Sequence, residues 1–401
     1  MATQFFALAE PDMSAGPSVG FHEVDEQASA IQYKSIFKSM LSAAKIMISK
    51  ARTIDGSVCT ILLYTLLATY PATANGQVPA SAEFESSVNA AFHKIRTITF
   101  AGADSVLIGV ISTIDVGSDG RLVITDEVGE QAILFEGNGN FVAHLEARLC
   151  NPGVVFYPTG AKIKPDSSVL VLGTSPWGFL FDKYGLCKSS LSTDFVGLGQ
   201  NELVLDGSDK MIGMYDTGTG HVLRFMNDSG QITKEVSLPI SPAPGVDYRW
   251  AGGGLVKTEK YLYFAVPSSS ALTQLDLEGR PVQVFESKNS WFRPINRDVP
   301  DPFDSISVDR HMRRIVQNRS MVDNVLLLDH DLVMIQYHNG DRRFGLQVFD
   351  EAGNLVTEIL GVADYFHHAY DGLAYRVVQP DIDERGNLPN PYVEVYEYRV
   401  R

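Results

Sequence analysis

The chain has 401 residues, of which 45% are hydrophobic, and its formal net charge is −15 at pH 7. This hydrophobic fraction predicts a globular core, and the length allows either two domains or a single large all-β domain. The acidic balance argues against nucleic acid as a partner, because phosphate binding needs a basic face.

Residues 47–74 have the order of parts expected of an export signal. The sequence MISKAR supplies positive charge, an apolar run follows over residues 58–67, and ATA at 72–74 offers the small residues that a signal peptidase reads. The apolar run has about a dozen residues, whereas a spanning helix needs roughly 20. We therefore expect cleavage after Ala74 rather than a retained signal anchor. This predicts a periplasmic or secreted protein without a stable membrane span.

Residues 1–46 carry no apolar period. We interpret them as the result of a start codon assigned too early or, alternatively, as an extension of the chain on the cytoplasmic side. Residues 75–93 are predicted to be a linker, and residues 94–401 carry a repeated pattern.

In that repeat, short runs rich in Val, Ile, Leu and Phe have the composition of β-strands, and two kinds of turn separate them. One kind contains a glycine, as in FEGNGNF and FDEAGNL, because glycine accepts a positive φ at no steric cost. The other kind is polar and joins two runs directly. Its acidic residues are Asp119, Asp166, Asp209, Glu259, Asp331 and Asp371, at spacings of 47, 43, 50, 72 and 40 residues.

Four strands in each unit of about 40–50 residues are typical of a β-propeller. A β-sandwich is the alternative, but it gives no reason for two kinds of turn to recur in a fixed order. We label the strands of a unit a to d, so that the polar turn joins a to b and the glycine turn joins c to d. Six polar turns but only five glycine turns are present, and the last unit therefore lacks its d strand.

We expect residues 94–100 (KIRTITF) to supply the missing strand, because pairing the two ends of the chain removes an exposed sheet edge. The prediction is an all-β fold, a six-bladed β-propeller of four-stranded blades, whose ring is closed by an N-terminal strand that pairs with the C-terminal blade.

The C-terminal run NPYVEVYEYRV, which follows a polar loop at 381–389, resembles the last blade of exported bacterial six-bladed β-propellers, the NHL-repeat and TolB-like propellers. The resemblance covers residues 90–401 and is carried by the blade pattern. It implies the fold and export of the protein, and it names no activity.

Two cysteines, Cys150 and Cys187, remain after the predicted cleavage. One disulfide is allowed in an oxidising compartment. However, the blade pattern puts Cys150 on a d–a connection and Cys187 just after a c–d turn, near opposite faces of the ring. A disulfide needs Cα atoms within about 7 Å, so the prediction is two free thiols.

The d–a and b–c connections of a propeller lie on one side of the ring, here called the mouth face. The a–b and c–d turns lie on the other side, here called the turn face. Tryptophans and arginines gather in the predicted mouth-face connections, where aromatic rings offer contact area and arginine recognises carboxylate or phosphate. The predicted ligand-binding residues are Arg249, Trp250, Trp291, Arg293, His338, Arg342, Arg343 and His368.

Two alternatives stay open for this face. The arginines could merely pair with neighbouring acids. The long insert at 288–320, before the a strand of blade 5, is either part of the binding site or a loop packed across the face.

No catalytic motif is present in the sequence: GxSxG, Walker A, HExxH and CxxC patterns are all missing. Histidines on separate blades could hold zinc and loop aspartates could hold calcium, but no ligand spacing connects them. We therefore predict no cofactor, with zinc or calcium as the alternative. The residues concerned are His221, His338 and His368 for zinc and Asp247, Asp301 and Asp304 for calcium.

These patterns favour a monomeric binding protein whose ligand is a small anionic or carbohydrate-like molecule or a protein partner. The alternative is an enzyme, a metal-dependent hydrolase or lyase acting on a small ester, lactone or sugar acid. Its candidate residues at the starts of the inner strands are Asn151, Asn201, Asp304 and His368.

Overall fold

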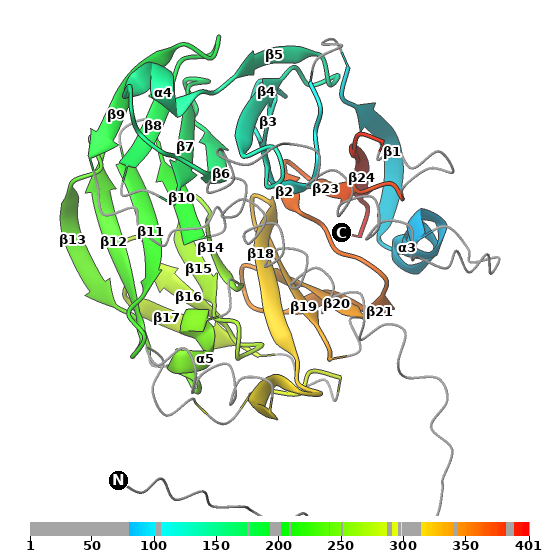
Figure 1. Ribbon diagram of the computed structural model, residues 1–401. Coiled ribbons are helices and arrows are strands. Elements are labelled where there is room, and N and C mark those ends of the chain that lie inside the picture. Colours follow the sequence, from blue (N-terminus) through cyan, green and yellow to red (C-terminus); the bar gives the residue numbers. More distant parts are fainter. Residues whose placement is uncertain are drawn as a thin grey trace, which may run out of the picture. The chain divides into compact units, whose positions relative to one another are not determined.

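The strands of the chain form six four-stranded antiparallel sheets, which are arranged as the blades of a ring (Figure 1). The computed structural model describes residues 80–400 except 102–105, 175–176, 193–201, 208–209, 240, 250–251, 287–290, 296–297, 299–313, 341–342 and 382–388. The described residues all belong to one compact unit, Gln77–Arg401. The predicted six-bladed β-propeller is therefore confirmed.

The blades follow one another along the chain, each from its innermost strand outward. Blade 1 contains β2 (Ile111–Val116), β3 (Leu122–Asp126), β4 (Gln131–Phe135) and β5 (Phe141–His144). Blade 2 contains β6 (Pro158–Ile163), β7 (Val169–Gly173), β8 (Trp177–Phe181) and β9 (Cys187–Ser192). Blade 3 contains β10 (Leu203–Asp206), β11 (Lys210–Asp216), β12 (His221–Asn227) and β13 (Ile232–Ser237).

The second half of the ring continues the order. Blade 4 contains β14 (Gly254–Lys257), β15 (Tyr261–Ala265), β16 (Leu272–Asp276) and β17 (Pro281–Phe285). Blade 5 contains β18 (Met321–Asp329), β19 (Leu332–His338), β20 (Phe344–Asp350) and β21 (Leu355–Val362). Blade 6 contains β22 (His368–Tyr370), β23 (Leu373–Val378), β24 (Tyr392–Tyr398) and, as its outermost strand, β1 (Phe92–Thr99).

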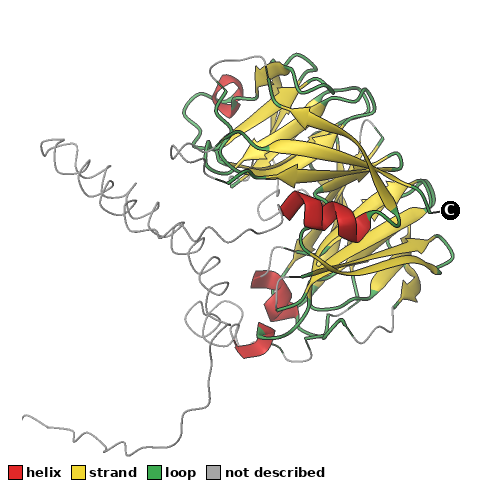
Figure 2. Ribbon diagram, turned by 90° about the vertical axis from the view of Figure 1, so that its right-hand side faces the viewer, coloured by secondary structure: helices red, strands yellow, loops and turns green. Residues whose placement is uncertain are grey.

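Helices are few and lie outside the sheets (Figure 2). Among the described residues the longer ones are α3 (Ala80–Val88), α4 (Ala147–Cys150) and α5 (Pro244–Arg249). The first of these lies in the segment predicted to be a linker, where the sequence suggested no regular element.

The five predicted glycine turns between strands c and d share one backbone geometry. Their glycines have φ values between +79° and +88°, a region that residues with a side chain rarely adopt; they are Gly139, Gly185, Gly230, Gly279 and Gly353. In each of the five hairpins the strand register shifts next to the turn, as expected when a left-handed glycine forms a bulge.

Each blade packs against the next through its own hydrophobic cluster. Among the described residues there are six such clusters, one for each pair of neighbouring blades. In the cluster between blades 1 and 2, for example, Val123 of β3 and Val171 of β7 are fully buried. The core is therefore divided into six wedges, and residues of the connections, such as Leu145 and Phe292, extend some of them.

The ring is closed by the antiparallel pairing of β1 with β24, with Phe92 opposite Tyr398 and Thr99 opposite Tyr392. This confirms the predicted closure, and the strand begins two residues before the predicted Lys94. In Figure 1 the blue β1 lies beside the red C-terminal strands.

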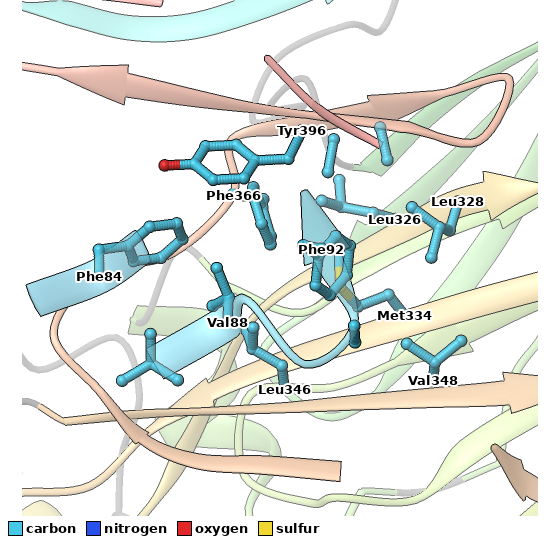
Figure 3. Close-up of a cluster of buried hydrophobic side chains, with 14 residues drawn as sticks. Phe84, Val88, Phe92, Leu326, Leu328, Met334, Leu346, Val348, Phe366 and Tyr396 are labelled. Carbon is cyan, nitrogen blue, oxygen red and sulfur yellow. The ribbon is translucent and has the colours of Figure 1, made fainter. Parts of the chain in front are cut away.

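Helix α3 extends the closure into the core. Phe84 and Val88, four residues apart on one face of the helix, are fully buried. The ring centroid of Phe84 lies 5.3 Å from that of Phe366 and 5.7 Å from that of Tyr396. Figure 3 shows these side chains together with Phe92 in one cluster. Burial of each phenylalanine contributes about 1.5–3 kcal/mol, so the N-terminal segment is bound firmly to blades 5 and 6.

A buried ionic network joins the closing strand to blade 6. The fully buried Arg376 on β23 lies 2.9 Å from Asp364 and 2.9 Å from Glu394, measured between the nearest nitrogen and oxygen atoms. The other oxygen of Glu394 accepts a 2.5 Å bond from the Lys94 Nζ of β1. The ring of Phe84 covers the guanidinium at 4.3 Å from its centroid.

The prediction of two free thiols is wrong, because Cys150 and Cys187 form a disulfide with a Cα–Cα distance of 5.4 Å. The error lay in assuming that a d–a connection keeps to the mouth face. After β5 the chain instead forms α4, which packs along β9, the outermost strand of blade 2, and reaches the residue at which that strand begins.

Replacing Glu394 by alanine tests the closing network. The change leaves Arg376 and Lys94 without a shared carboxylate, and removing one partner of a buried ion pair costs about 3–5 kcal/mol in the free energy of unfolding. Chemical denaturation followed by circular dichroism measures this. The control is Glu235→Ala, which breaks a more exposed 2.8 Å pair with Arg224 and should cost less than about 1 kcal/mol. Equal losses in the two variants would contradict the role of the network.

Candidate functional site

The mouth face of blades 3 to 5 contains most of the predicted binding residues that the structure describes. Trp291 and Arg293 lie in the connection between blades 4 and 5, and His338 and Arg343 flank the connection between strands b and c of blade 5. The remaining predicted residues of this face lie outside the described residues: Trp250, Arg342 and the side chain of Arg249, together with the calcium candidates Asp301 and Asp304.

Two mouth-face connections interlock through a small core of their own. Ala243 and Val246, from the connection between blades 3 and 4, are buried against Ile295 of the next connection and Met321 at the start of β18. The described parts of the 288–320 insert are thus packed over the ends of blades 4 and 5.

Hydrogen bonds hold these connections in register. One oxygen of Asp298 accepts bonds of 2.8 Å and 3.1 Å from the backbone N–H groups of Gly245 and Val246. Arg293 donates its backbone N–H to the Ser320 hydroxyl at 2.8 Å, and the Ser320 N–H returns a 2.9 Å bond to the Arg293 carbonyl. The backbone that carries the Arg293 side chain is therefore fixed on both sides.

Asp247, a calcium candidate, is buried and accepts several hydrogen bonds. It accepts a 2.8 Å bond from the Ser268 backbone N–H, a 3.0 Å bond from the Ser268 hydroxyl and a bond from the Ser241 hydroxyl. Burial raises the pKa of Asp247, and the bonds from Ser241 and Ser268 oppose that shift. Nearby in blade 3, His221 is buried with its Nε2 atom 3.1 Å from Asp216.

Trp291 is half-buried and does not stand free on the surface. Its ring packs edge-on against Tyr337 with centroids 5.5 Å apart, and the neighbouring Phe292 packs on the same tyrosine at 5.1 Å. Arg293, by contrast, is exposed. The segment therefore combines an aromatic anchor with an accessible cation.

His338 forms an ion pair or a hydrogen-bonded pair with Asp323, since its Nδ1 lies 2.7 Å and 2.9 Å from the two carboxylate oxygens. Burial raises the pKa of Asp323, although His338 opposes the shift. Tyr365 packs nearby on Phe344 at 5.0 Å, and burial, Asp364 and Asp323 all raise its pKa. The phenol therefore stays protonated at neutral pH.

Arg343 pairs with Glu83 of helix α3. This contact fits the alternative interpretation, in which a loop arginine pairs with a neighbouring acid. It also links the helix that closes the ring to the mouth-face edge of blade 5.

His368 lies apart from the other predicted residues. It opens β22, a strand of three residues that ends at the a–b turn, and its Nδ1 atom is 3.7 Å from Asp115 on β2. The same Asp115 oxygen is 3.4 Å from the Lys162 Nζ atom of β6. Burial lowers the pKa of His368 to about 4, Asp115 partly opposes this, and Lys162 adds to it.

Sequence reasoning missed Asp115 and Lys162, although a signal was present. The innermost strands of blades 1 to 4 each carry a charged residue at or next to their last position. In chain order these residues are Asp115, Lys162, Asp206 and Lys257, so the charge alternates from blade to blade. A 3.3 Å pair between Asp206 of β10 and Lys257 of β14 repeats the first pair. Comparing the same strand position between blades would have found these neighbours.

The three histidines proposed as zinc ligands do not converge. Among the described residues, one group of three metal-ligating side chains has all its ligand atoms within 4.8 Å of one another, and it consists of Asp329, His330 and Asp371. These residues lie on the a–b turns of blades 5 and 6, at the turn face. Exposed acidic groups often gather without an ion, so we assign no metal to them.

Comparisons with known proteins show the fold and no more. No protein-family model matches the chain, and no curated protein matches it. A predicted exported protein from Bacteroides fragilis NCTC 9343 has a solved structure that superimposes with a TM-score of 0.55 at 9% identity, covering 78% of this chain and 97% of that one. A member of the DUF4221 family from Bacteroides vulgatus ATCC 8482 superimposes with a TM-score of 0.52 at 6% identity, covering 77% and 98%.

Across the described ranges, no helix has both the length and the apolar character needed to cross a membrane.

The buried His368 should make stability depend on pH. Its folded-state pKa of about 4 lies below the value of about 6.5 in the unfolded chain. The unfolded state therefore binds the proton first, and stability present above pH 6.5 is lost as the pH falls towards 4, by up to about 3 kcal/mol. Urea unfolding at pH 7, 5.5 and 4.5 measures the loss, which should be smaller in His368→Gln.

The matched control is His93→Gln, at an exposed position on β1. If the two variants lose the same stability between pH 7 and pH 4.5, the buried histidine has no part in the effect.

Proposed function

We propose that the chain is an extracytoplasmic binding protein whose ligand lies against the mouth face of blades 4 and 5. The observation that carries this proposal is the interlocking of the two connections through Val246, Ile295 and Met321. Loops packed in this way hold their side chains in place before a ligand arrives, which lowers the entropic cost of binding.

The chemistry of this surface favours an anionic or carbohydrate-like ligand, or an acidic segment of a partner protein. Arg293 is exposed on a fixed backbone, and Arg249 ends the helix that Asp298 and Asp247 hold. Arginine forms charge-assisted, often bidentate hydrogen bonds with carboxylates and phosphates. In a chain with a net charge of −15, an exposed arginine such as Arg293 gives an anion a favourable place of contact.

Export of the protein is part of this proposal. The signal-like order of residues 47–74 and the disulfide between Cys150 and Cys187 both support it, since disulfides persist in oxidising compartments. The Bacteroides fragilis protein of similar fold is itself described as a predicted exported protein. We further propose that the chain is related to the NHL-repeat or TolB-like propellers, which its blade pattern resembles.

The export proposal predicts the mass of the protein isolated from its native host. The chain should begin at Asn75 or within a few residues of it. It should also be two hydrogen atoms lighter than the reduced chain, because Cys150 and Cys187 are joined. Intact-mass spectrometry before and after reduction tests both points. A chain that retains residues 1–46 would refute the export signal, and a mass unchanged by reduction would refute the disulfide.

The binding proposal predicts the effect of Arg249→Ala combined with Arg293→Ala. The probes are oligogalacturonate, a carboxylated saccharide, and a polyglutamate peptide, each titrated by calorimetry. The wild-type chain should bind at least one of them, and the double variant at least about tenfold more weakly, since each lost charged hydrogen bond contributes about 1.5–3 kcal/mol. At Arg293, which is exposed, the change should leave folding unaffected, because exposed loop changes usually stay within about 0.5 kcal/mol.

The matched control removes the same charge from the turn face, by Arg280→Ala and Arg399→Ala, both at exposed arginines. If this variant weakens binding as much as the mouth-face variant does, the site is not on the mouth face. If the wild-type chain binds neither probe, the proposed ligand class is wrong.

A further inference from the structure

A pocket of about 310 Å³ opens on the turn face, at the junction of blades 1 and 2 and away from the mouth-face site. It lies between the a–b and c–d turns of both blades. Its polar lining consists of Asp119, Arg121, Glu136, Ser167, Lys183 and Tyr184.

The floor of the pocket is a rigid network centred on Arg121, whose side chain is only 9% exposed. Its Nε atom donates a 2.7 Å bond to Asp119, and one terminal nitrogen donates a 3.1 Å bond to the Ser167 carbonyl of blade 2. The other terminal nitrogen donates to the carbonyl of Lys183. A single side chain of blade 1 therefore holds both turns of blade 2.

The wall is the c–d turn of blade 2, and it too is fixed. One oxygen of Asp182 accepts bonds of 2.8 Å and 2.9 Å from the N–H groups of Tyr184 and Leu186. Gly185 lies so close to blade 1 that a Cβ on it would be 2.3 Å from the Cβ of Ala143. Held in this way, the Tyr184 side chain remains 64% exposed at the rim.

Two groups at the rim are open to a ligand. The Glu136 carboxylate has no hydrogen-bond or ion-pair partner among the described residues, and Lys183 makes only a cation–π contact there, its Nζ lying 5.0 Å from the centre of the Tyr184 ring. The pocket thus offers an acceptor, a donor and an aromatic surface. Its charges cancel, since Asp119 and Arg121 neutralise each other and Glu136 and Lys183 are opposite in sign.

We infer that this pocket is a binding site for an uncharged saccharide of one or two rings. A sugar ring has an apolar C–H face, which suits an exposed tyrosine, and hydroxyl groups, which both donate and accept hydrogen bonds. A volume of about 310 Å³ lies at the small end of the range of ligand pockets, as expected for one or two rings.

A zwitterion such as a dipeptide could also meet Glu136 and Lys183. Exposed ion pairs contribute little in water. The energy of binding must therefore come mainly from the tyrosine ring and the fixed floor, which favours the saccharide.

The test uses the full chain and saturation-transfer NMR with three probes: maltose, cellobiose and N,N′-diacetylchitobiose. At least one disaccharide should show transfer in the wild-type protein. Tyr184→Ala should weaken its binding at least tenfold, and Glu136→Gln should weaken it less, since the amide still accepts hydrogen bonds. The control is Tyr370→Ala, which removes a partly exposed tyrosine from the turn face of blade 6 and should change nothing.

Three outcomes would overturn the inference: no transfer to any disaccharide, equal transfer in the Tyr184→Ala variant, or tighter binding of the dipeptide Gly-Leu than of every sugar. The arginine double variant of the mouth face should bind the disaccharide normally. The experiments therefore test the saccharide site and the mouth-face site independently of each other.

Discussion

The pairing of β1 with β24 is the contact on which the ring depends, because it joins the beginning of the propeller to its end through the backbone hydrogen bonds of one sheet. The buried Arg376 pairs with Asp364 and Glu394, and Glu394 also binds Lys94 of β1, so this network links the closing strand to blade 6. A buried charge is tolerated only when it is paired, so the loss of one member of this network would leave an uncompensated charge where the closing strand docks. Helix α3 packs beside this pair of strands, and its Phe84 ring lies over the guanidinium group of Arg376.

Closure separates the buried interfaces between blades from two exposed faces. The six clusters between blades bury the strands, while the connections at the mouth face and the turns at the opposite face stay free to carry chemistry. The two faces differ in construction. At the mouth face, long connections build a second small core around Val246 and Ile295. At the turn face, short turns are held by single side chains, such as Arg121, which donates three hydrogen bonds.

Near the ring axis, charged side chains of neighbouring blades neutralise one another. Asp115 with Lys162 and Asp206 with Lys257 occupy equivalent ends of the innermost strands. The ammonium group of Lys162 supplies the positive charge beside Asp115. The imidazole of His368 therefore faces a compensated carboxylate, and with its pKa lowered to about 4 by burial it stays neutral at physiological pH.

The sequence by itself determined the number of blades, the order of the two kinds of turn and the strand that closes the ring. The strands and turns are local features, because a glycine with a positive φ and a run of alternating apolar residues need no distant partner. The closing strand pairs across the whole propeller, and it could be predicted because the last unit lacked one strand and the N-terminal run was left to supply it. Only the tertiary structure decided which side chains meet. Arg343 pairs with Glu83 across 260 residues, and Cys150 reaches Cys187 because α4 follows the outer strand of the next blade. Such contacts depend on the path of loops between blades, and the repeat pattern does not specify that path.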